Sequence, residues 1–449
     1  MSIGPQTPAI LITEPGSEQG LVRAIGVRGL TANIVNTTIG AGIFVLPALV
    51  ARDLGSAAPL AYLACGLAMT FVVASFAMAG SRVSLTGGIY AYVEVAFGPL
   101  IGFLTGFLVW LACLMAAASV ASALAASVAL AVPVFAMPVL RALGLGIVFA
   151  TLASVNVRGV AMGTRLVEIV TVAKLLPLLL LTAVGLLWVK PEHLAIEWAA
   201  PDRIGTASLT LIFAFVGIEV ALVPSGEIRD PARTVPRAVF LALGLTTLLY
   251  LLLQLVAHAV LGPALGSFVD APLAEVASRV LGPLGRIVIL VGGGISMLGF
   301  LSSDALGTPR SLYAFARDGL LPAPLARLHP RFHTPWLAIL VHAALAWALA
   351  SLGSFGVLAL LSNVAVLWSY LLCCLAAIEL RRRNVQTGGR PFVLPGGPLV
   401  PVLACVVLLW LLSHATAQEF AVTGGAVVVA ALLFAWRGMR TQAPLVDPV

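Results

Sequence analysis

"NTTIGAGIFVLP", residues 36–47, sets two glycines one residue apart inside an apolar segment that runs from about residue 29 to 51. Glycine weakens a helix by about 1 kcal/mol relative to alanine and frees backbone N–H and carbonyl groups to meet a ligand. Inside a bilayer, non-helical backbone is tolerated only where it is buried in protein or lines a cavity. The stretch predicts a polar socket at mid-membrane or, alternatively, a close helix contact through small residues.

The composition of the whole chain is that of a membrane protein. Of 449 residues, 61% are hydrophobic and 10% charged, and the mean hydropathy is +1.09. Soluble domains are about half apolar and about a quarter charged. A helical span needs roughly 20 apolar residues, whereas a membrane barrel would show short alternating segments. The chain has about twelve long apolar stretches: 29–51, 57–81, 100–132, 138–157, 166–189, 205–226, 237–262, 285–307, 335–352, 356–379, 398–414 and 419–436.

Arginines gather on one alternate set of loops and tails, among them the run Arg381, Arg382 and Arg383. Cytoplasmic loops retain Lys and Arg, so both termini are expected in the cytoplasm of a bacterial-type inner (plasma) membrane. The N-terminal sequence is polar and acidic, which does not fit a secretory signal, and the first helix is expected to stay. The net charge of +7 is spread over separate loops, which argues against a nucleic-acid partner.

Several chemistries are excluded by motif. The chain's two lysines, Lys174 and Lys190, follow no glycine-rich loop, so a phosphate-binding P-loop is absent. No HExxH or CxxC pattern occurs, and no nucleophile-base pair is evident. We therefore expect no metal, no cofactor and no enzymatic activity. His258 and His342 are interpreted as packing residues inside spans and receive no role.

Three charged residues fall inside or next to apolar spans. Lys174 lies near the middle of the fifth stretch, where a charge costs at least about 2.5 to 3.5 kcal/mol, so it should face a cavity and a partner unless it snorkels to the surface. Glu219 lies in the middle of the sixth stretch. Asp304 is either a boundary residue or deeply placed, depending on whether the eighth helix ends at Thr308. All three are candidate proton carriers.

A second interruption, "FAFVGIE" at 213–219, lies five spans after the first. This spacing is typical of an inverted repeat of five plus five helices whose discontinuous helices one and six meet at the substrate. The predicted fold is all-α with twelve transmembrane helices, the last two peripheral. The predicted parts are a cytoplasmic tail (1–22), a first repeat (23–195), a second repeat (196–384), and helices eleven and twelve with the C-terminal tail (385–449).

Five motifs in order extend the comparison over nearly the whole chain: "TTIGAGIF", "TGGIYAYVEVAFG" (86–98), "FAFVGIE", "EIRDPARTVPRA" (227–238) and "ARDGLLPAPLARLHPRFHTP" (316–335). With these motifs the chain resembles the amino acid-polyamine-organocation (APC) transporters, which have the leucine-transporter fold. The resemblance implies that backbone amides hold a substrate carboxylate, at Ala41 and Gly42, with Gly40 allowing the approach. It also implies that backbone carbonyls hold the substrate ammonium, at Thr38, Phe213, Ala214 or Val216.

The resemblance also suggests how transport is coupled. Lys174 matches a helix-five lysine that some members carry where sodium-coupled relatives bind a sodium ion, which favours protons. Glu219 matches a helix-six glutamate proposed as proton-sensitive in arginine/agmatine exchangers, although those exchangers lack the lysine. Asp304 falls where helix eight lines the family's site.

The predicted function is proton-coupled symport of amino acids by alternating access, in which a bundle of helices one, two, six and seven rocks against the rest. The alternatives are an amino acid/amine exchanger and a sensor of the same fold that transports nothing. The expected partners are an amino acid, protons and the lipid bilayer. Side-chain specificity and oligomeric state stay open.

Overall fold

The computed structural model describes residues 25–83, 87–159, 164–194, 198–219, 222, 228–386, 391–394 and 396–441. In these ranges the regular structure is helical apart from one isolated parallel bridge between Ile25 and Ile228. The predicted all-α membrane class is therefore confirmed.

The helices follow the apolar stretches of the sequence. Their bounds are α1 (Val27–Thr38), α2 (Gly42–Leu54), α3 (Ala58–Gly80), α4 (Ile89–Phe97), α5 (Pro99–Ala131), α6 (Pro138–Val157), α7 (Thr164–Gly185), α8 (Pro201–Leu211), α9 (Pro231–Leu261), α10 (Pro272–Gly307), α11 (Pro309–Arg317), α12 (Trp336–Leu352), α13 (Phe355–Arg382), α14 (Leu399–Leu412) and α15 (Ala417–Thr441). Short 3-10 helices are η1 (Gly55–Ala57), η2 (Pro133–Ala136), η3 (Leu186–Trp188), η4 (Pro191–Leu194), η5 (Ile212–Ala214), η8 (Gly262–Ser267) and η9 (Ala323–Ala326).

Eight helical segments of the described chain are long and apolar enough to cross a membrane. Two further apolar helices, α12 and α14, have 17 and 14 residues. The first two predicted stretches merge into one segment, Gly42–Gly80, and the sixth contributes only the 11 residues of α8 before its helix breaks. The prediction of twelve crossings thus stays a prediction, because broken and short helices carry several of them.

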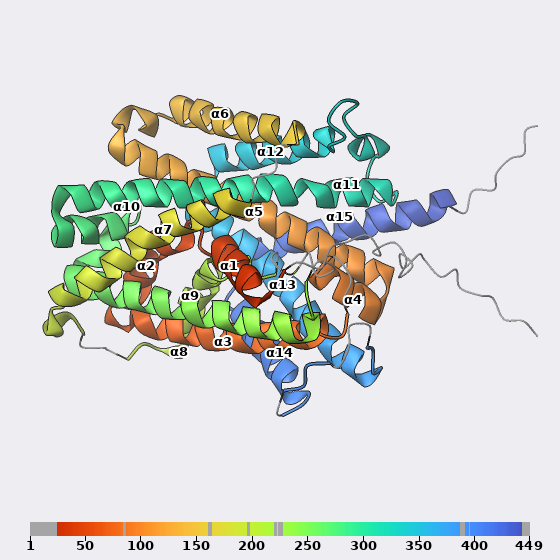
Figure 1. Cartoon of the computed structure of the whole chain (residues 1–449), viewed down its shortest axis with the longest axis horizontal. Coiled ribbons are helices and arrows are strands. Elements are labelled where there is room, and N and C mark those ends of the chain that lie inside the picture. Colours follow the sequence, from red (N-terminus) through yellow and green to blue (C-terminus); the bar gives the residue numbers. More distant parts are fainter. Residues whose placement is uncertain are drawn as a thin grey trace, which may run out of the picture.

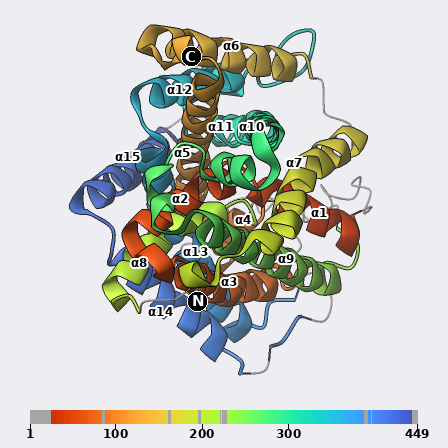
Figure 2. The ribbon, with the colours of Figure 1, turned by 90° about the vertical axis from the view of Figure 1, so that its left-hand side faces the viewer.

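The long helices run along one axis of the molecule, as Figure 1 shows. In the end-on view of Figure 2, α6 and α12 form an outer layer on one side and α14 lies on the opposite side. The core between them is built by α5 packed on α13 and by α3 packed on α9. Short α1 lies within this core against α7, α9 and α10, so its broken end is enclosed by protein.

Both predicted interruptions are breaks in the helices. At the first, Ile39 leaves the helical conformation (φ −81°, ψ 88°), and α2 starts three residues later at Gly42. At the second, α8 passes into η5 and then into turns that run through Glu219. Gly217 lies in these turns with φ +114°, a conformation that L side chains rarely adopt.

The two breaks pack directly on each other through their glycines. A Cβ on Gly42 would lie 3.0 Å from Ala214 Cα, and one on Gly217 would lie 2.8 Å from the Thr37 carbonyl oxygen. The Thr37 hydroxyl also donates a hydrogen bond to the Gly217 carbonyl at 3.0 Å. The helix break and the close contact through small residues, two alternatives at the level of sequence, are thus the same feature.

Replacing Gly217 by alanine should destabilise the protein by about 1 to 3 kcal/mol, because the added methyl group meets both a positive φ and the Thr37 carbonyl. The matched control is Gly244→Ala in α9, where an added Cβ has no neighbour within 4 Å. Alanine there should leave stability unchanged or raise it by up to about 1 kcal/mol. Thermal unfolding in detergent measures both; equal melting temperatures would contradict the packing argument.

Candidate functional site

The carbonyl groups released by the first break are held by a buried lysine. Lys174 of α7 is 1% exposed, and its Nζ donates hydrogen bonds to the carbonyl oxygens of Asn36 (2.5 Å) and Ile39 (2.8 Å). These two carbonyls lie on either side of the last helical residue of α1, Thr38. The partner expected for this lysine is therefore unwound backbone, and neither Glu219 nor Asp304 pairs with it among the described contacts.

Two hydroxyl groups complete the cap on this break. Ser296 of α10, fully buried, donates to the carbonyls of Ile39 and Gly40, at 3.1 Å each. The Tyr250 hydroxyl of α9 lies 3.4 Å from the Thr38 carbonyl. Sequence reasoning missed both residues, and the signal that could have identified them is a lone polar side chain inside an apolar span.

The N–H groups at the first break begin a helix and are buried. No loop or cap hydrogen bond within the described chain starts from the N–H groups of Ala41 or Gly42. These groups begin the 13-residue helix α2, where the helix dipole favours negative charge. The Phe300 ring covers neighbouring Gly40, with ring carbon 3.3 Å from where a Cβ would be. The residues predicted for carboxylate binding therefore lie together at one helix N-terminus.

The second break lies on the other side of this contact, and several of its carbonyls accept no hydrogen bond from the described residues. Among described loop residues, the carbonyl of Ile212 accepts from two N–H groups, and those of Phe213, Ala214 and Val216 accept none. Asn363 of α13 supports the break by donating its Nδ2 to the Leu209 (2.7 Å) and Thr210 (3.2 Å) carbonyls. Asn363 was not predicted from the sequence.

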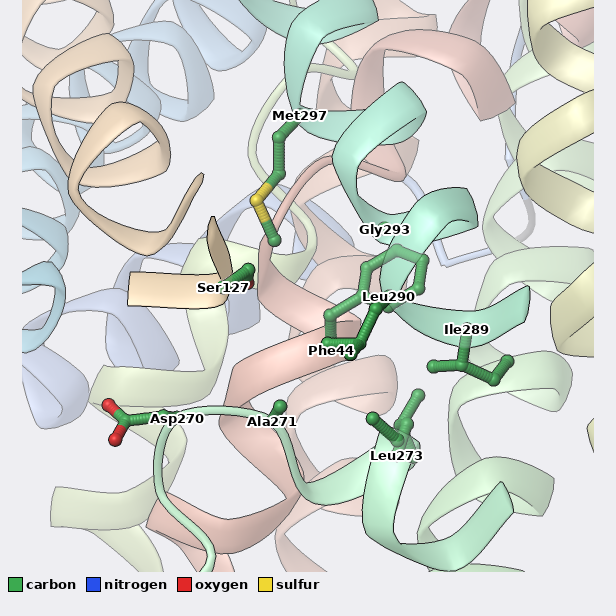
Figure 3. A pocket seen from close by; sticks show the side chains of 10 residues that line it. Phe44, Ser127, Asp270, Ala271, Leu273, Ile289, Leu290, Gly293 and Met297 are labelled. Carbon is green, nitrogen blue, oxygen red and sulfur yellow. The ribbon is translucent and has the colours of Figure 1, made fainter. Parts of the chain in front are cut away.

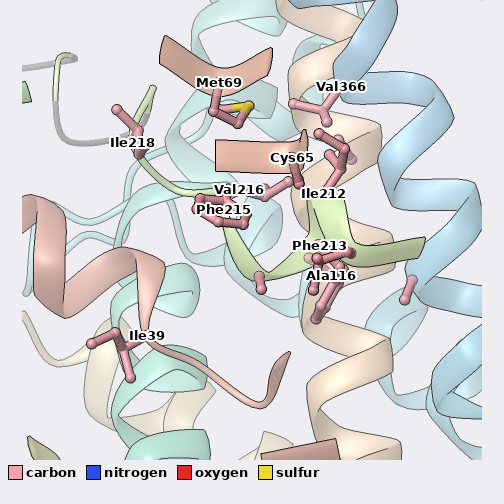
Figure 4. Packing of buried hydrophobic residues seen from close by; sticks show 14 of the residues in the cluster. Ile39, Cys65, Met69, Ala116, Ile212, Phe213, Phe215, Val216, Ile218 and Val366 are labelled. Carbon is pink, nitrogen blue, oxygen red and sulfur yellow. The ribbon is translucent and has the colours of Figure 1, made fainter. Parts of the chain in front are cut away.

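Apolar side chains surround the second break. Figure 4 shows them around the segment that carries Phe213 and Val216: Cys65 and Met69 of α3, Ala116 of α5 and Val366 of α13. Phe213 also packs edge-on against Phe355 at 5.3 Å between ring centroids.

Glu219 is buried, and its carboxylate is hydrogen-bonded both within its own segment and to α13. It is 2% exposed, and its carboxylate oxygens accept hydrogen bonds from the Gly217 N–H at 3.1 and 3.0 Å. The Tyr370 hydroxyl of α13 donates to the same carboxylate at 2.6 Å. The carboxylate therefore fixes the turn after η5 onto α13.

Asp304 lies apart from the breaks, in a pair that the sequence did not suggest. His342 Nε2 of α12 lies 2.8 Å from one carboxylate oxygen, and the Thr308 hydroxyl donates to the other at 2.6 Å. α10 ends at Gly307, and α11 follows directly at Pro309, so the chain stays helical on both sides of Thr308. The depth of Asp304 in the membrane stays a prediction, whereas His342 has a charged partner that the packing interpretation did not foresee.

A small hollow opens beside the first break (Figure 3). About 240 Å³ of empty space, part of it open to solvent, lies there between α2, α5, α10 and the segment before α10. Phe44 and Met297 face it, each close in sequence to a residue of the break, and Ser127 and Asp270 are its polar lining residues. The two breaks themselves are closed off from solvent, since Thr38 and Ala41 are 3% and 0% exposed.

The described side chains offer no cluster of three or more His, Cys, Asp or Glu residues that could hold a metal ion. What the arrangement offers instead is a set of bare backbone dipoles of both signs in a dry environment.

Comparison with known proteins places these features in a family. Residues 25–436 match a family described as amino acid permease. The chain is 34% identical over 424 residues to the uncharacterized transporter Rv1999c of Mycobacterium tuberculosis, covering 91% of each chain. It is 26% identical to the branched-chain amino acid permease BcaP of Bacillus subtilis, covering 90% of each, and 26% identical to the serine/threonine exchanger SteT of the same organism, covering 86% of this chain and 90% of that one.

Ser296→Ala should destabilise the protein by about 1 to 3 kcal/mol and weaken substrate binding, because it leaves the Ile39 and Gly40 carbonyls short of a donor. The matched control is Ser369→Ala in α13, since this buried serine bonds only to a carbonyl of its own helix, 3.3 Å away. Thermal unfolding with and without amino acid measures both effects. Equal losses in the two variants would show that Ser296 does not support the break.

Proposed function

Because this chain belongs to the amino acid permease family of the APC superfamily, we propose that it is a proton-coupled symporter of amino acids that works by alternating access. It is a multi-pass membrane permease and not an enzyme. The single observation that carries the proposal is the contact of two broken helices, α1/α2 and α8/η5, at which several backbone groups have no hydrogen-bond partner among the described residues.

The substrate carboxylate binds the N–H groups of Ala41 and Gly42, with Gly40 permitting the approach. The substrate ammonium binds the carbonyls of Thr38, Phe213, Ala214 or Val216; that of Thr38 also accepts the Gly40 N–H at 3.0 Å. Helix N-termini attract carboxylates and bare carbonyls attract ammonium groups, and these complementary ends match one zwitterion. Because Gly42 packs on Ala214 in this conformation, the two breaks must separate slightly to admit the zwitterionic substrate.

The architecture proposed around this site is twelve crossings with a five-plus-five inverted repeat. The first repeat is 23–195 and the second 196–384, and 385–449 forms two peripheral helices and a tail. Support comes from the two breaks, which lie five apolar stretches apart and meet in space. The arginine-rich loops support a plasma-membrane orientation with both termini in the cytoplasm.

Proton coupling is assigned first to Lys174. It is the one of the three candidate charges that touches the first break, so a change in its charge acts directly on the Asn36 and Ile39 carbonyls. Glu219 instead holds the second break through Gly217. Proton binding and substrate binding thereby act on the same unwound backbone.

A neutral amino acid is the substrate class that fits best. The carboxylate of Glu219 is taken by Tyr370 and Gly217, and that of Asp304 by His342 and Thr308. The described side chains around the second break are apolar. A cationic side chain would find no free carboxylate there.

Exchange without net proton flow is the second candidate, favoured by the similarity to a relative named a serine/threonine exchanger. Counterflow separates the two, because an exchanger takes up label only when the opposite side is loaded. A sensor of the same fold would bind an amino acid and show no flux in either assay.

Purified protein in liposomes should accumulate a labelled neutral amino acid under an inward pH gradient. A one-unit gradient supports about a tenfold concentration ratio for each coupled proton. Lys174→Ala should lower this accumulation about tenfold, the share of one coupled proton, while Lys190→Ala, in the loop after η3, should retain it. Uptake indifferent to pH, or full accumulation by Lys174→Ala, would refute the coupling mechanism.

Competition for uptake tests the substrate class. Unlabelled neutral amino acids should inhibit, whereas lysine and arginine should bind at least about 100-fold more weakly, since burying an unpaired charge costs several kcal/mol. A thermal-shift screen gives an independent measure, because a bound ligand raises the melting temperature. Strong inhibition by arginine would contradict the charge argument.

A further inference from the structure

The pair formed by Asp304 and His342 is a buried ionisable site that the substrate contacts do not use. The side chains are 6% and 2% exposed, and Nε2 lies 2.8 Å from Oδ2. Thr308 donates to Oδ1, so both carboxylate oxygens are already satisfied. The second ring nitrogen, His342 Nδ1, is buried and has no hydrogen-bond partner in the described part of the chain.

From this geometry we infer that the pair binds a proton at His342 Nδ1 during transport, which makes it a second coupling site besides Lys174. The inference rests on the proposed function. With a neutral imidazole donating from Nε2, the pair carries one negative charge in a dry environment. A proton taken from the aqueous phase onto Nδ1 makes an imidazolium beside the carboxylate, with no other bond broken and no net charge left. Low-polarity surroundings favour the neutral pair over a lone buried charge.

The titratable and charged groups near Asp304 and His342 are as follows. The Cys113 thiol of α5 is hydrogen-bonded to Thr308 and interacts electrostatically with Asp304. Beyond Thr308, α11 carries Arg310 and Tyr313. The Cys113 thiol also interacts with Glu219, whose carboxylate is bonded to Gly217 and Tyr370. Other helices packed against α10 and α12 carry charged groups whose described contacts lie elsewhere: Lys174 of α7, Arg141 of α6, Arg317 of α11, Arg52 of α2 and Arg233 of α9. α9 also carries Arg237 and His258. On α9, Tyr250 faces Thr38.

Helix α10, which carries Asp304, also contacts the first helix break. Ser296, Phe300 and Asp304 follow one another at intervals of four residues, so they lie along neighbouring faces of α10 within about 12 Å. Ser296 bonds to the carbonyls of Ile39 and Gly40, and Phe300 covers Gly40. A change of charge at Asp304 therefore acts on a rigid element in direct contact with the break.

The test uses the full chain in liposomes with His342→Gln and Asp304→Asn. Each variant keeps a side chain that can hydrogen-bond to the other member of the pair. His342→Gln removes the proton site, and Asp304→Asn removes the carboxylate that stabilises the imidazolium. Accumulation under a one-unit inward pH gradient should fall about tenfold, the share of one coupled proton. Counterflow of labelled amino acid, which needs no net proton flow, should stay within about twofold of the unmodified protein.

The matched control is His258→Gln, because His258 is also a buried histidine with a free Nδ1 but has no carboxylate partner among the described contacts. It should retain accumulation. Unchanged accumulation in His342→Gln and Asp304→Asn, with the unmodified protein responding to pH, overturns this inference and leaves the proposed function standing. Loss of counterflow in both variants also overturns it, since the pair would then be structural. If accumulation by the unmodified protein does not depend on the pH gradient, the proposed proton coupling is itself wrong.

Discussion

The structure depends on one constraint, which is that backbone polar groups freed inside a bilayer must find partners within the protein. Breaking α1 at Ile39 releases carbonyls at a depth where water cannot reach them. Lys174, Ser296 and Tyr250, each from a different helix, provide those partners. The arrangement of α7, α9 and α10 around α1 therefore follows from the need to complete a broken helix.

The same constraint explains why charged residues persist in apolar helices. Lys174 is stabilised by carbonyl dipoles, Glu219 by the Gly217 N–H and the Tyr370 hydroxyl, and Asp304 by a histidine. None of these contacts joins Lys174 to a carboxylate, so each charge acts on a separate part of the fold.

The glycines give the breaks their second property, a close approach between segments far apart in sequence. Gly42 meets Ala214 and Gly217 meets Thr37 with no space for a larger residue. Small residues of this kind let two short, irregular segments pack as tightly as regular helices do. Tight packing explains why the breaks are closed in this conformation and why binding a substrate must involve movement of one break relative to the other.

The sequence by itself determined that the chain is a helical membrane protein, at which residues two of its predicted spans break, and which charged residues lie buried. These properties depend on local composition: apolar length specifies a span, and glycine pairs weaken a helix wherever they occur. Only the tertiary structure decided that Lys174 holds backbone and that His342, unremarkable in sequence, pairs with Asp304. It also revealed Ser296, Tyr250 and Asn363, because partners distant along the chain depend on how helices rotate and pack, which no local pattern records.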